Sequence, residues 1–415
     1  MRILWASHSS QIGGAELCLL EGATAVRDQG AEVVVVVPEN GPLEDRLQAA
    51  SIAVVVVPYQ RWAHPKPSAL GRAIRVATQA QNAWRLRSVV DRVCPDVVVT
   101  NTVTIPAAAL AARLAGVPHV WYIHEYGDLD HRLTFDYGVR ASLQVVGALS
   151  DRVIVNSSAV GRHFARFLGR TPVDLVHYAV PLEWSGERPP AADAAFSVVL
   201  VGRKHPGKRQ EDAVRALAIL RRRGVDAALT LVGASDPGYD VYLRRLVADG
   251  NLTGHVWFVG HVADPSPHVA GADVALMCSA NEAFGRVTVE AMKLGVPVVG
   301  AASGGTLDIV RDQETGLLYR PGDPTDLADK LEALHRDPAG RARMGRAARD
   351  DARTRFTMEK YGRRLLQTFE RASTGRRRLP PPPVTSYARM PSDPTPAATP
   401  ASGDVAHRSD PAARP

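Results

Sequence analysis

The sequence has 415 residues, of which 45% are hydrophobic and 22% charged, with a formal net charge of +7. This length suits two globular domains, and this hydrophobic fraction excludes a chain that is disordered throughout. The cysteines Cys18, Cys94 and Cys278 lie too far apart for a disulfide framework or a zinc site, and the basic balance comes with no nucleic-acid-binding motif, so we expect a reducing compartment and no nucleic acid as a partner.

The apolar runs of the chain are short. Val33–Val37 and Val54–Val57 are each followed by a proline, whereas a membrane helix needs about 20 apolar residues. No apolar leader with a cleavage pattern follows Met1, so we expect no signal peptide. We therefore expect a cytoplasmic protein whose basic helices leave peripheral contact with the inner membrane face open.

Valine-rich runs alternate with helical patterns in the first part of the chain. Continuous apolar runs are typical of strands buried on both faces of a parallel sheet. Helical periodicity separates several of them, over Ala15–Gln29 and Ser68–Val93. The predicted strands are Ile3–Ser7, Val33–Val37, Ala53–Val57, Val97–Thr100, His119–Ile123 and Val153–Asn156.

A proline-rich break over Pro181–Ala195 precedes a second series of the same kind. The sequence therefore predicts an α/β fold of two Rossmann-like, doubly wound domains, residues 1–182 and 183–357. A helix is expected over residues 358–373, and the Pro-rich residues 374–415 are predicted to be a disordered tail. The predicted strands of the second domain are Ser197–Val201, Ala228–Val232, Val256–Val259, Val274–Met277, Pro297–Val299 and Gly316–Tyr319.

Ligands of doubly wound folds bind beyond the carboxyl ends of the strands, so the residues after each predicted strand are candidates for a site. In the first half, Gly13 and Gly14 precede a helix whose free amides suit an anion, although a plain tight turn explains the glycines equally well. His124 closes another strand, and a lone histidine there is more often structural than functional.

A basic loop follows the first strand of the second half. Four cations crowd it together with a histidine, and we favour phosphate binding over a merely solvated loop because position and charge agree. These residues are Arg203, Lys204, His205, Lys208 and Arg209.

Two glutamates frame the segment after Val274–Met277. Glu282 is expected in a loop and Glu290 on the following helix, so that both carboxylates face one cleft and accept hydrogen bonds from sugar or ribose hydroxyls. The simpler interpretation of Glu290 is an exposed charge on a helix, but its apolar neighbours argue against this interpretation. Free amides suited to phosphate lie between the glutamates, at Phe284, Gly285, Arg286 and Val287.

A second glycine pair, Gly304 and Gly305, opens a later helix and predicts another anion site by the same logic. The sequence contains no cluster with metal-ligand spacing, so we expect neither a metal nor another cofactor.

Together these features resemble the retaining glycosyltransferases of family 4, which have the GT-B fold with two domains facing a central cleft. The resemblance runs from residue 1 to about residue 373. Glu282 and Glu290 match the E-x7-E motif of that family. The other matching residues are Arg203 and Lys208 after a Val-Gly turn, the loop Gly13-Gly14-Ala15-Glu16, the pair Gly304-Gly305, and His124 at a strand end.

The resemblance implies that a sugar moves from a UDP- or GDP-linked donor to the hydroxyl of an unidentified glycan, lipid or small metabolite, without a metal. Arg203 and Lys208 would neutralise the leaving diphosphate, Glu282 and His124 would contact the donor sugar, and Glu290 would bind ribose. Gly14 would seat the phosphates or admit the sugar. A covalent intermediate on Glu282 and a front-face route both stay open.

Two other functions stay open: a nucleotide-sugar epimerase or phosphorylase of the same fold, and a non-catalytic nucleotide-binding protein. The sequence also departs from the family at His177–Pro181, where an Asn-Gly turn is usual. The segment Tyr126–Gly138 matches no motif and is equally well an acceptor loop or a surface loop.

Overall fold

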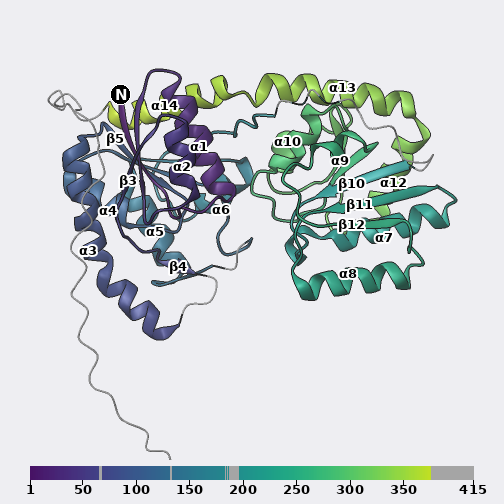
Figure 1. The fold of residues 1–415 in the computed structure, drawn as a ribbon, viewed down its shortest axis with the longest axis horizontal. Coiled ribbons are helices and arrows are strands. Elements are labelled where there is room, and N and C mark those ends of the chain that lie inside the picture. Colours follow the sequence, from purple (N-terminus) through teal and green to yellow (C-terminus); the bar gives the residue numbers. More distant parts are fainter. Residues whose placement is uncertain (65–67, 131–132, 183, 185, 187–195, 375–415) are drawn as a thin grey trace, which may run out of the picture.

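The computed structural model describes residues 1–64, 68–130, 133–182, 184, 186 and 196–374. The chain forms an N-terminal half around a seven-stranded sheet and a C-terminal half around a six-stranded sheet, with helices on both faces of each (Figure 1). Neighbouring strands are parallel in both sheets. The predicted fold class, two Rossmann-like doubly wound halves, is confirmed.

The N-terminal sheet has the order β3-β2-β1-β5-β6-β8-β9, so the chain switches direction across the sheet between β1 and β5. Its strands are β1 (Arg2–Ala6), β2 (Glu32–Val37), β3 (Ala53–Val56), β5 (Val97–Asn101), β6 (His119–Ile123), β8 (Arg152–Val155) and β9 (Val173–Leu175). Its helices are α1 (Gly14–Arg27), α2 (Pro42–Ala49), α3 (Ala69–Val93), α4 (Ala107–Ala115), α5 (Val139–Leu149) and α6 (Ser158–Ala165).

The C-terminal sheet has the order β12-β11-β10-β13-β14-β15, with its switch between β10 and β13. Its strands are β10 (Phe196–Val201), β11 (Ala227–Val232), β12 (Val256–Val259), β13 (Val274–Met277), β14 (Val298–Ala301) and β15 (Gly316–Tyr319). The accompanying helices are the short 3-10 helix η1 (Pro206–Lys208), α7 (Gln210–Arg222), α8 (Pro237–Asp249), α9 (Ser266–Ala270), α10 (Arg286–Lys293), α11 (Thr306–Ile309), α12 (Pro324–Arg336) and α13 (Pro338–Arg355).

Alternate residues of the buried strands serve two cores, which explains the continuous apolar runs. In β1, Ile3 and Trp5 join the cluster formed with α1, whereas Leu4 and Ala6 join the cluster formed with α3 and α4. The first cluster continues into the C-terminal half through residues such as Tyr178 and Phe284. The two halves thus share buried apolar side chains where they meet.

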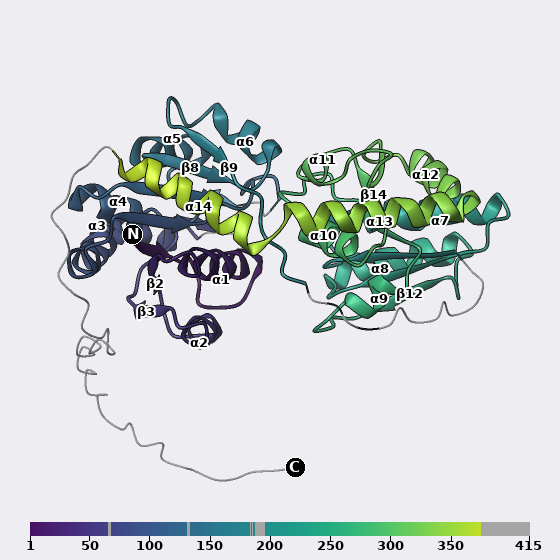
Figure 2. The same ribbon diagram turned by 90° about the horizontal axis from the view of Figure 1, so that it is seen from above.

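The last described helix, α14 (Met358–Ser373), returns from the C-terminal half to the N-terminal half, where it packs on α1 (Figure 2). Tyr361, Leu365 and Phe369 are buried on its inner face. The ring of Phe369 meets that of Trp5 edge-on at 5.8 Å, and Tyr361 Oη donates a hydrogen bond to the carbonyl of Cys18 (3.2 Å).

The predicted strands are all present, with ends shifted by at most two residues. The sequence missed the edge strand β9 and the small antiparallel pair β4 (Ala63–His64) and β7 (Thr134–Phe135). Residue 183, the predicted start of the second domain, most of the predicted linker and nearly all of the predicted tail lie outside the described residues. Within the described parts of the chain, every helix is too short or too polar to span a bilayer.

Candidate functional site

The predicted site residues come from loops beside the two switch points. Lys208 follows β10 and Glu282 follows β13, the strands that flank the switch of the C-terminal sheet. Gly13 and Gly14 follow β1 in the N-terminal sheet, and His124 follows β6, so all of them stand at carboxyl edges of sheets. Ligand sites of doubly wound proteins are found at these positions.

The structure brings Lys208 and Glu282 together. Lys208 Nζ lies 2.6 Å from Glu282 Oε2, and the two side chains are 38% and 14% exposed. A charge-assisted hydrogen bond of this length holds the ammonium and the carboxylate at one point. Because the pair remains partly open to solvent, a ligand with its own anionic and hydroxyl groups has access to both partners.

Arg203 lies apart from this pair. Its guanidinium is exposed and forms an ion pair with Asp236, with Nε donating to Oδ1 at 2.7 Å. Because an exposed ion pair contributes little free energy, a phosphate can replace Asp236 as the partner of Arg203 at small cost.

The basic loop holds fewer available cations than the sequence indicates. Lys204 is buried and donates hydrogen bonds to the carbonyls of Gly233 and Val259, and burial lowers its pKa. Arg209 is paired with Asp212, its Nε lying 2.7 Å from Oδ2. Of the four cations in this loop, Lys204 therefore stabilises its own fold, and Arg203 and Lys208 remain the predicted phosphate contacts.

Glu290 occupies the second turn of α10, and its carboxylate forms no hydrogen bond with another described residue. Burial raises its pKa, and the nearby Arg286 partly offsets this effect. Glu290 is partly buried, and a carboxyl withdrawn from water without protein partners is costly unless a ligand supplies them. At the start of the same helix, Gly285 adopts a positive φ of 104° and turns the chain so that the amides of Arg286 and Val287 are left without intrahelical acceptors.

The pair Gly304-Gly305 has a packing explanation. A Cβ on Gly304 would lie 2.3 Å from the carbonyl oxygen of Glu282, and one on Gly305 would lie 2.5 Å from that of Phe284. The amide of Gly305 donates to the Glu282 carbonyl at 2.7 Å. The helix that comes next, α11, has four residues. These glycines therefore fix the backbone of the Glu282 loop, and the separate anion site expected there stays a prediction.

The N-terminal glycines differ from one another in their surroundings. A Cβ on Gly13 would lie 2.8 Å from Glu16 Oε2, whereas one on Gly14 would meet nothing within 4 Å. Gly13 is the N-cap of α1 and provides no side-chain cap, so the first amides of this 14-residue helix have no capping side chain. Gly14 thus borders open space at the positive end of a helix.

His124 is held from both sides of its ring. Nε2 lies 2.7 Å from Asn101 Oδ1, an acceptor, so this nitrogen carries the proton, and Nδ1 accepts from the hydroxyl of Tyr178. Asn156 Nδ2 donates to the same hydroxyl at 2.8 Å. Burial, with a smaller effect of His8, lowers the pKa of His124 to about 3, so the imidazole is neutral at ordinary pH.

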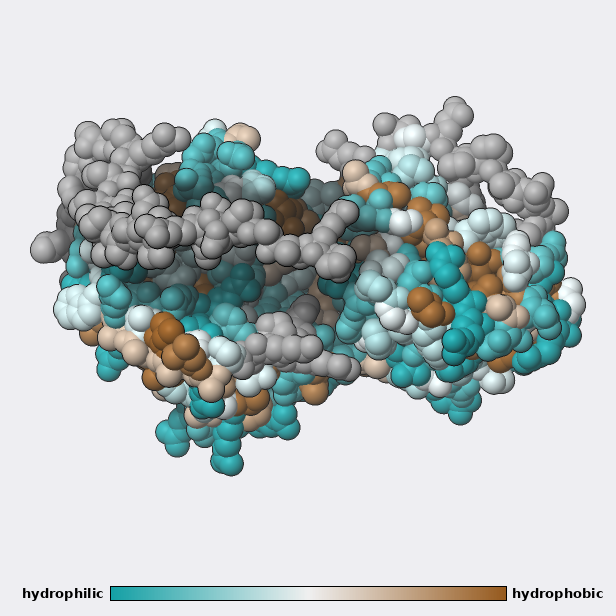
Figure 3. Space-filling model, turned by 60° about the horizontal axis from the view of Figure 1, so that its bottom comes forward, coloured by the Kyte–Doolittle hydropathy of each residue, from teal (hydrophilic) through white to brown (hydrophobic). Residues whose placement is uncertain are grey.

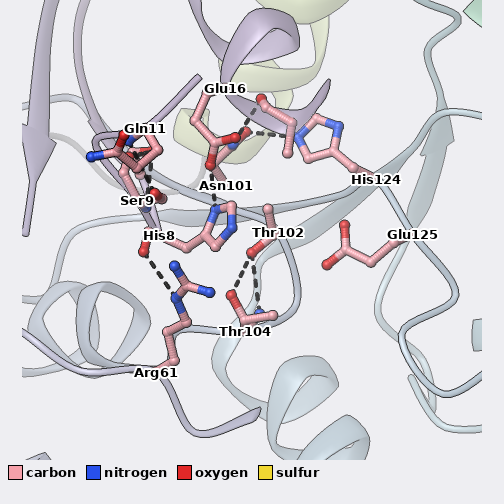
Figure 4. A network of polar contacts seen from close by, with 12 residues as sticks. His8, Ser9, Gln11, Glu16, Arg61, Asn101, Thr102, Thr104, His124 and Glu125 are labelled. Atoms are coloured by element: carbon pink, nitrogen blue, oxygen red, sulfur yellow. Dashed lines mark hydrogen bonds and ion pairs between the residues drawn. The ribbon is translucent and has the colours of Figure 1, made fainter. Parts of the chain in front are cut away.

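Sequence reasoning missed a group of polar residues around His124. His8 and Glu16 form a close pair at 2.9 Å (Figure 4). Glu125 Oε1 accepts from the amide of Val103 at 2.9 Å. Burial raises the pKa of Glu125 to about 8. Thr102, a β-branched residue, adopts a positive φ of 68°, which is a strained conformation. The sequence signal for this group is its position after β1, β5 and β6, at the carboxyl edge of the sheet.

The side chain of Arg286 joins the two halves. Its guanidinium forms two parallel bonds with Glu21 of α1, at 2.6 and 2.8 Å. Burial raises the pKa of Glu21, and Arg286 opposes this shift. A second contact between the halves joins α11 to α6, where Asp308 accepts from the amide of Ser158 at 2.6 Å. The side chain of Arg286 therefore bridges the two halves. The backbone amide of Arg286 is the group that is left to contact a nucleotide-sugar donor.

The first residue of the segment Tyr126–Gly138 lies beside the candidate site. Tyr126 is buried, and Asp130 caps this turn by accepting from the amides of Tyr126 and Gly127 at 2.9 and 2.8 Å. Burial raises the pKa of Tyr126 to about 12, with contributions from Asp130 and, across the two halves, Glu282. Residues 131–132 lie outside the described residues.

Among the residues that the structure describes, no group of three or more His, Cys, Asp or Glu side chains is arranged to hold a metal ion. Independence of a metal stays a prediction.

Two Rossmann-like halves with candidate sites at their switch points define the GT-B fold of transferases. Comparisons with known proteins identify the family. The family description "Glycosyltransferase Family 4" matches residues 12–184, and "Glycosyl transferases group 1" matches residues 187–351. A GDP-mannose-dependent alpha-(1-6)-phosphatidylinositol monomannoside mannosyltransferase of Mycobacterium tuberculosis is 34% identical over 271 residues, covering 59% of this chain and 68% of the relative. The chain belongs to the family 4 glycosyltransferases.

Two further proteins are similar to this chain. A D-inositol 3-phosphate glycosyltransferase of Pseudarthrobacter chlorophenolicus is 35% identical over 181 residues, covering 42% of this chain and 43% of the relative. The chain thus spans less than half the length of that relative. The crystal structure of Anabaena Alr3699/HepE in complex with UDP is 25% identical with a TM-score of 0.70, covering 89% of this chain and all of that one.

Proposed function

We propose that this protein is a retaining glycosyltransferase that moves a hexose from a UDP- or GDP-linked donor to a hydroxyl of an acceptor, without a metal. The observation that carries the proposal is the Lys208–Glu282 ion pair at the switch point of the C-terminal sheet. Its cation suits a diphosphate and its carboxylate suits sugar hydroxyls. The family membership and the UDP complex of the Anabaena protein support this assignment.

The leaving group determines what the C-terminal half must do. As the bond between sugar and diphosphate breaks, negative charge grows on the diphosphate, and fixed donors that point at it lower the barrier. In our proposal Lys208 exchanges Glu282 for the diphosphate, Arg203 exchanges Asp236, and the first amides of α10 add the positive end of a helix. Glu282, released from Lys208, then accepts from hydroxyls of the donor sugar.

Glu290 is assigned to the ribose of the donor. Its partly buried carboxyl has no hydrogen bond with another described residue, and the loss of water around it raises its pKa. Two neighbouring ribose hydroxyls are donors of the kind that would stabilise it. Gly14 leaves open space beside the helix N-terminus of α1, which suits the close approach of a phosphate or sugar.

His124 is assigned to the donor sugar as a positioning contact. Its ring is neutral and its two nitrogens are already hydrogen-bonded, so in our proposal a sugar hydroxyl replaces Asn101 or Tyr178 as a partner of the ring. Glu125 and the His8–Glu16 pair stand at the same sheet edge. Hydroxyl and carboxylate groups at this edge suit an acceptor rich in hydroxyls.

A thermal-shift screen with UDP, GDP, ADP and their sugar conjugates tests the proposal first, because a ligand that binds the native state alone raises the melting temperature. We expect a shift with one nucleotide diphosphate, unchanged by EDTA, and the shift should be reduced in Lys208→Ala but kept in Lys360→Ala, a change of an exposed lysine on α14. Shifts with none of them would contradict the proposal. Conversion of the bound nucleotide sugar to its epimer without an acceptor would establish the epimerase instead.

A further inference from the structure

The first part of α3 projects beyond the body of the N-terminal half (Figure 1). None of residues 69–78 is buried, and the buried residues of this helix begin at Gln79. Within the part of the chain that the structure describes, two side-chain contacts join the projecting part to other elements: Arg75 is paired with Asp136 at 2.6 Å, and Thr78 Oγ1 donates to Gln60 Oε1 at 3.1 Å. These turns therefore receive little stabilisation from the core, although they carry large apolar side chains.

The apolar side chains of α3 form a stripe on its outer face. Leu70, Ile74 and Trp84 are 73%, 49% and 64% exposed. They are spaced by four and ten residues, which places them on one side of a helix with 3.6 residues per turn, and Ala73, Ala77 and the polar Gln81 lie on the same side between them. The buried residues, such as Leu86 and Val90, lie on the opposite side. The helix thus has one apolar face in the core and a second one toward solvent.

The charge of α3 has one sign. The helix contains five arginines and a single acidic residue, Asp91, which is paired with Arg87 at 2.8 Å. Arg85 and Arg92 are exposed and form no ion pair with a described residue. They follow Ile74 by three and five whole turns and so continue the outer face. In the space-filling view from the side on which α3 projects, hydrophobic residues gather among strongly hydrophilic ones on this half of the molecule (Figure 3).

We propose that the outer face of α3 docks on an anionic lipid bilayer. Leu70, Ile74 and Trp84 would enter the boundary between headgroups and acyl chains, while Arg85 and Arg92 would contact lipid phosphates. A helix with arginines and a tryptophan beside an apolar stripe has the composition of helices that lie in the plane of a membrane surface. The absence of unpaired acidic residues on α3 favours a negatively charged surface over a neutral one.

A protein partner or a second copy of the chain would also cover an apolar stripe. The arginines favour lipid, because a second copy would bring the same positive charges against each other. The proposal concerns surface attachment alone and does not depend on the transfer reaction, so its test needs no substrate.

Sedimentation of the full chain with vesicles tests the proposal. Vesicles of phosphatidylcholine with phosphatidylglycerol should bind the protein, and vesicles of phosphatidylcholine alone should bind it about tenfold less, with binding that weakens as salt is added. The double variant Ile74→Ser/Trp84→Ser should lower binding about tenfold or more, because two apolar side chains no longer leave water. Its matched control is Val241→Ser/Trp257→Ser, which changes two residues that are 61% and 49% exposed on the C-terminal half.

A charge-matched pair completes the experiment. Arg85→Gln/Arg92→Gln should weaken binding to the anionic vesicles and leave the residual binding to neutral vesicles unchanged. Arg222→Gln/Arg346→Gln removes two exposed arginines of the C-terminal half and should leave both unchanged. Wild-type protein that binds neither vesicle, or that binds equally after the α3 changes, overturns the proposal. A dimer in solution that Ile74→Ser/Trp84→Ser dissociates would assign the stripe to self-association instead.

Discussion

The C-terminal half holds its candidate groups in loops that solvent reaches, whereas the N-terminal half buries its candidate groups at the sheet edge. Lys208 and Glu282 meet in a partly exposed ion pair, and Arg203 is more exposed still. His124 and Glu125 are buried, and the histidine is hydrogen-bonded on both ring nitrogens. Charged groups that exchange partners cheaply suit the binding and release of an anion, while a buried neutral network suits the fixed placement of hydroxyls.

The largest expected effect is on turnover in the C-terminal half. Glu282→Gln keeps the size of the side chain but removes the charge that faces Lys208, and we expect kcat to fall about 100- to 1,000-fold while the melting temperature changes little. Steady-state release of the nucleotide diphosphate measures it. Glu314→Gln, at an exposed carboxylate 4.0 Å from Arg311, is the control and should keep wild-type kcat. Wild-type turnover in Glu282→Gln would remove this residue from the site.

The next effect is on the pH dependence of stability in the N-terminal half. The pKa of Glu125 is about 8 in the folded protein, raised by burial from 4.5, so its stabilising contribution is present below pH 4.5 and is lost as the pH rises through 8. Glu125→Gln removes this dependence. Between pH 5 and pH 8, the free energy of unfolding of the wild type should therefore fall by up to about 4 kcal/mol more than that of the variant.

Urea unfolding at several pH values measures this difference. The exposed Glu39→Gln serves as the control and should follow the wild type at every pH. A difference between Glu125→Gln and wild type that stays constant with pH would show that Glu125 is not held in a desolvated environment.

A smaller effect is expected on nucleotide affinity. Lys208→Ala removes one charge-assisted contact to the diphosphate, so the Kd for UDP or GDP should rise about 10- to 100-fold. Isothermal titration calorimetry measures it, with Lys360→Ala as the control. If Kd is unchanged while the nucleotide still binds, the basic loop does not contact the diphosphate.

The smallest effect tests how firmly His124 is held. Tyr178→Phe removes the hydroxyl that donates to His124 Nδ1 and accepts from Asn156, and we expect a loss of about 1–2 kcal/mol in unfolding free energy at pH 7. Urea unfolding measures it, with the exposed Tyr137→Phe as a control that should change little. Equal stability of the two variants would mean that the network adds no rigidity, and the contrast between the halves would fail.

The sequence was sufficient for the architecture because buried parallel strands leave a strong pattern. Every strand with a continuous apolar run was found, while β9, a three-residue edge strand, and β4 and β7, with two residues each, are too short to show a period. The E-x7-E spacing identified Glu282 and Glu290, and the structure shows the first in contact with Lys208 and the second partly buried.

The site was less predictable where side-chain direction decides. Lys204 and Lys208 stand four residues apart in one basic loop, and only the fold shows that the first turns inward to two carbonyls while the second meets Glu282. The Gly304-Gly305 pair has the local pattern of an anion loop, yet its closest neighbours are carbonyls of the Glu282 loop. The burial that changes the pKa of Glu125 comes from elements distant in sequence, so no local pattern reveals it.

The return of α14 reverses the order in which the two cores are completed during synthesis. Strand β1, with Trp5, leaves the ribosome before every other described element, but the helix that covers Trp5 through Phe369 is translated after all of them. The C-terminal core has all its strands and helices once α13 has emerged, at Arg355. At that point the N-terminal core still lacks helix α14. Because domains fold as units during translation, the N-terminal core is completed only after the whole C-terminal half has been synthesised.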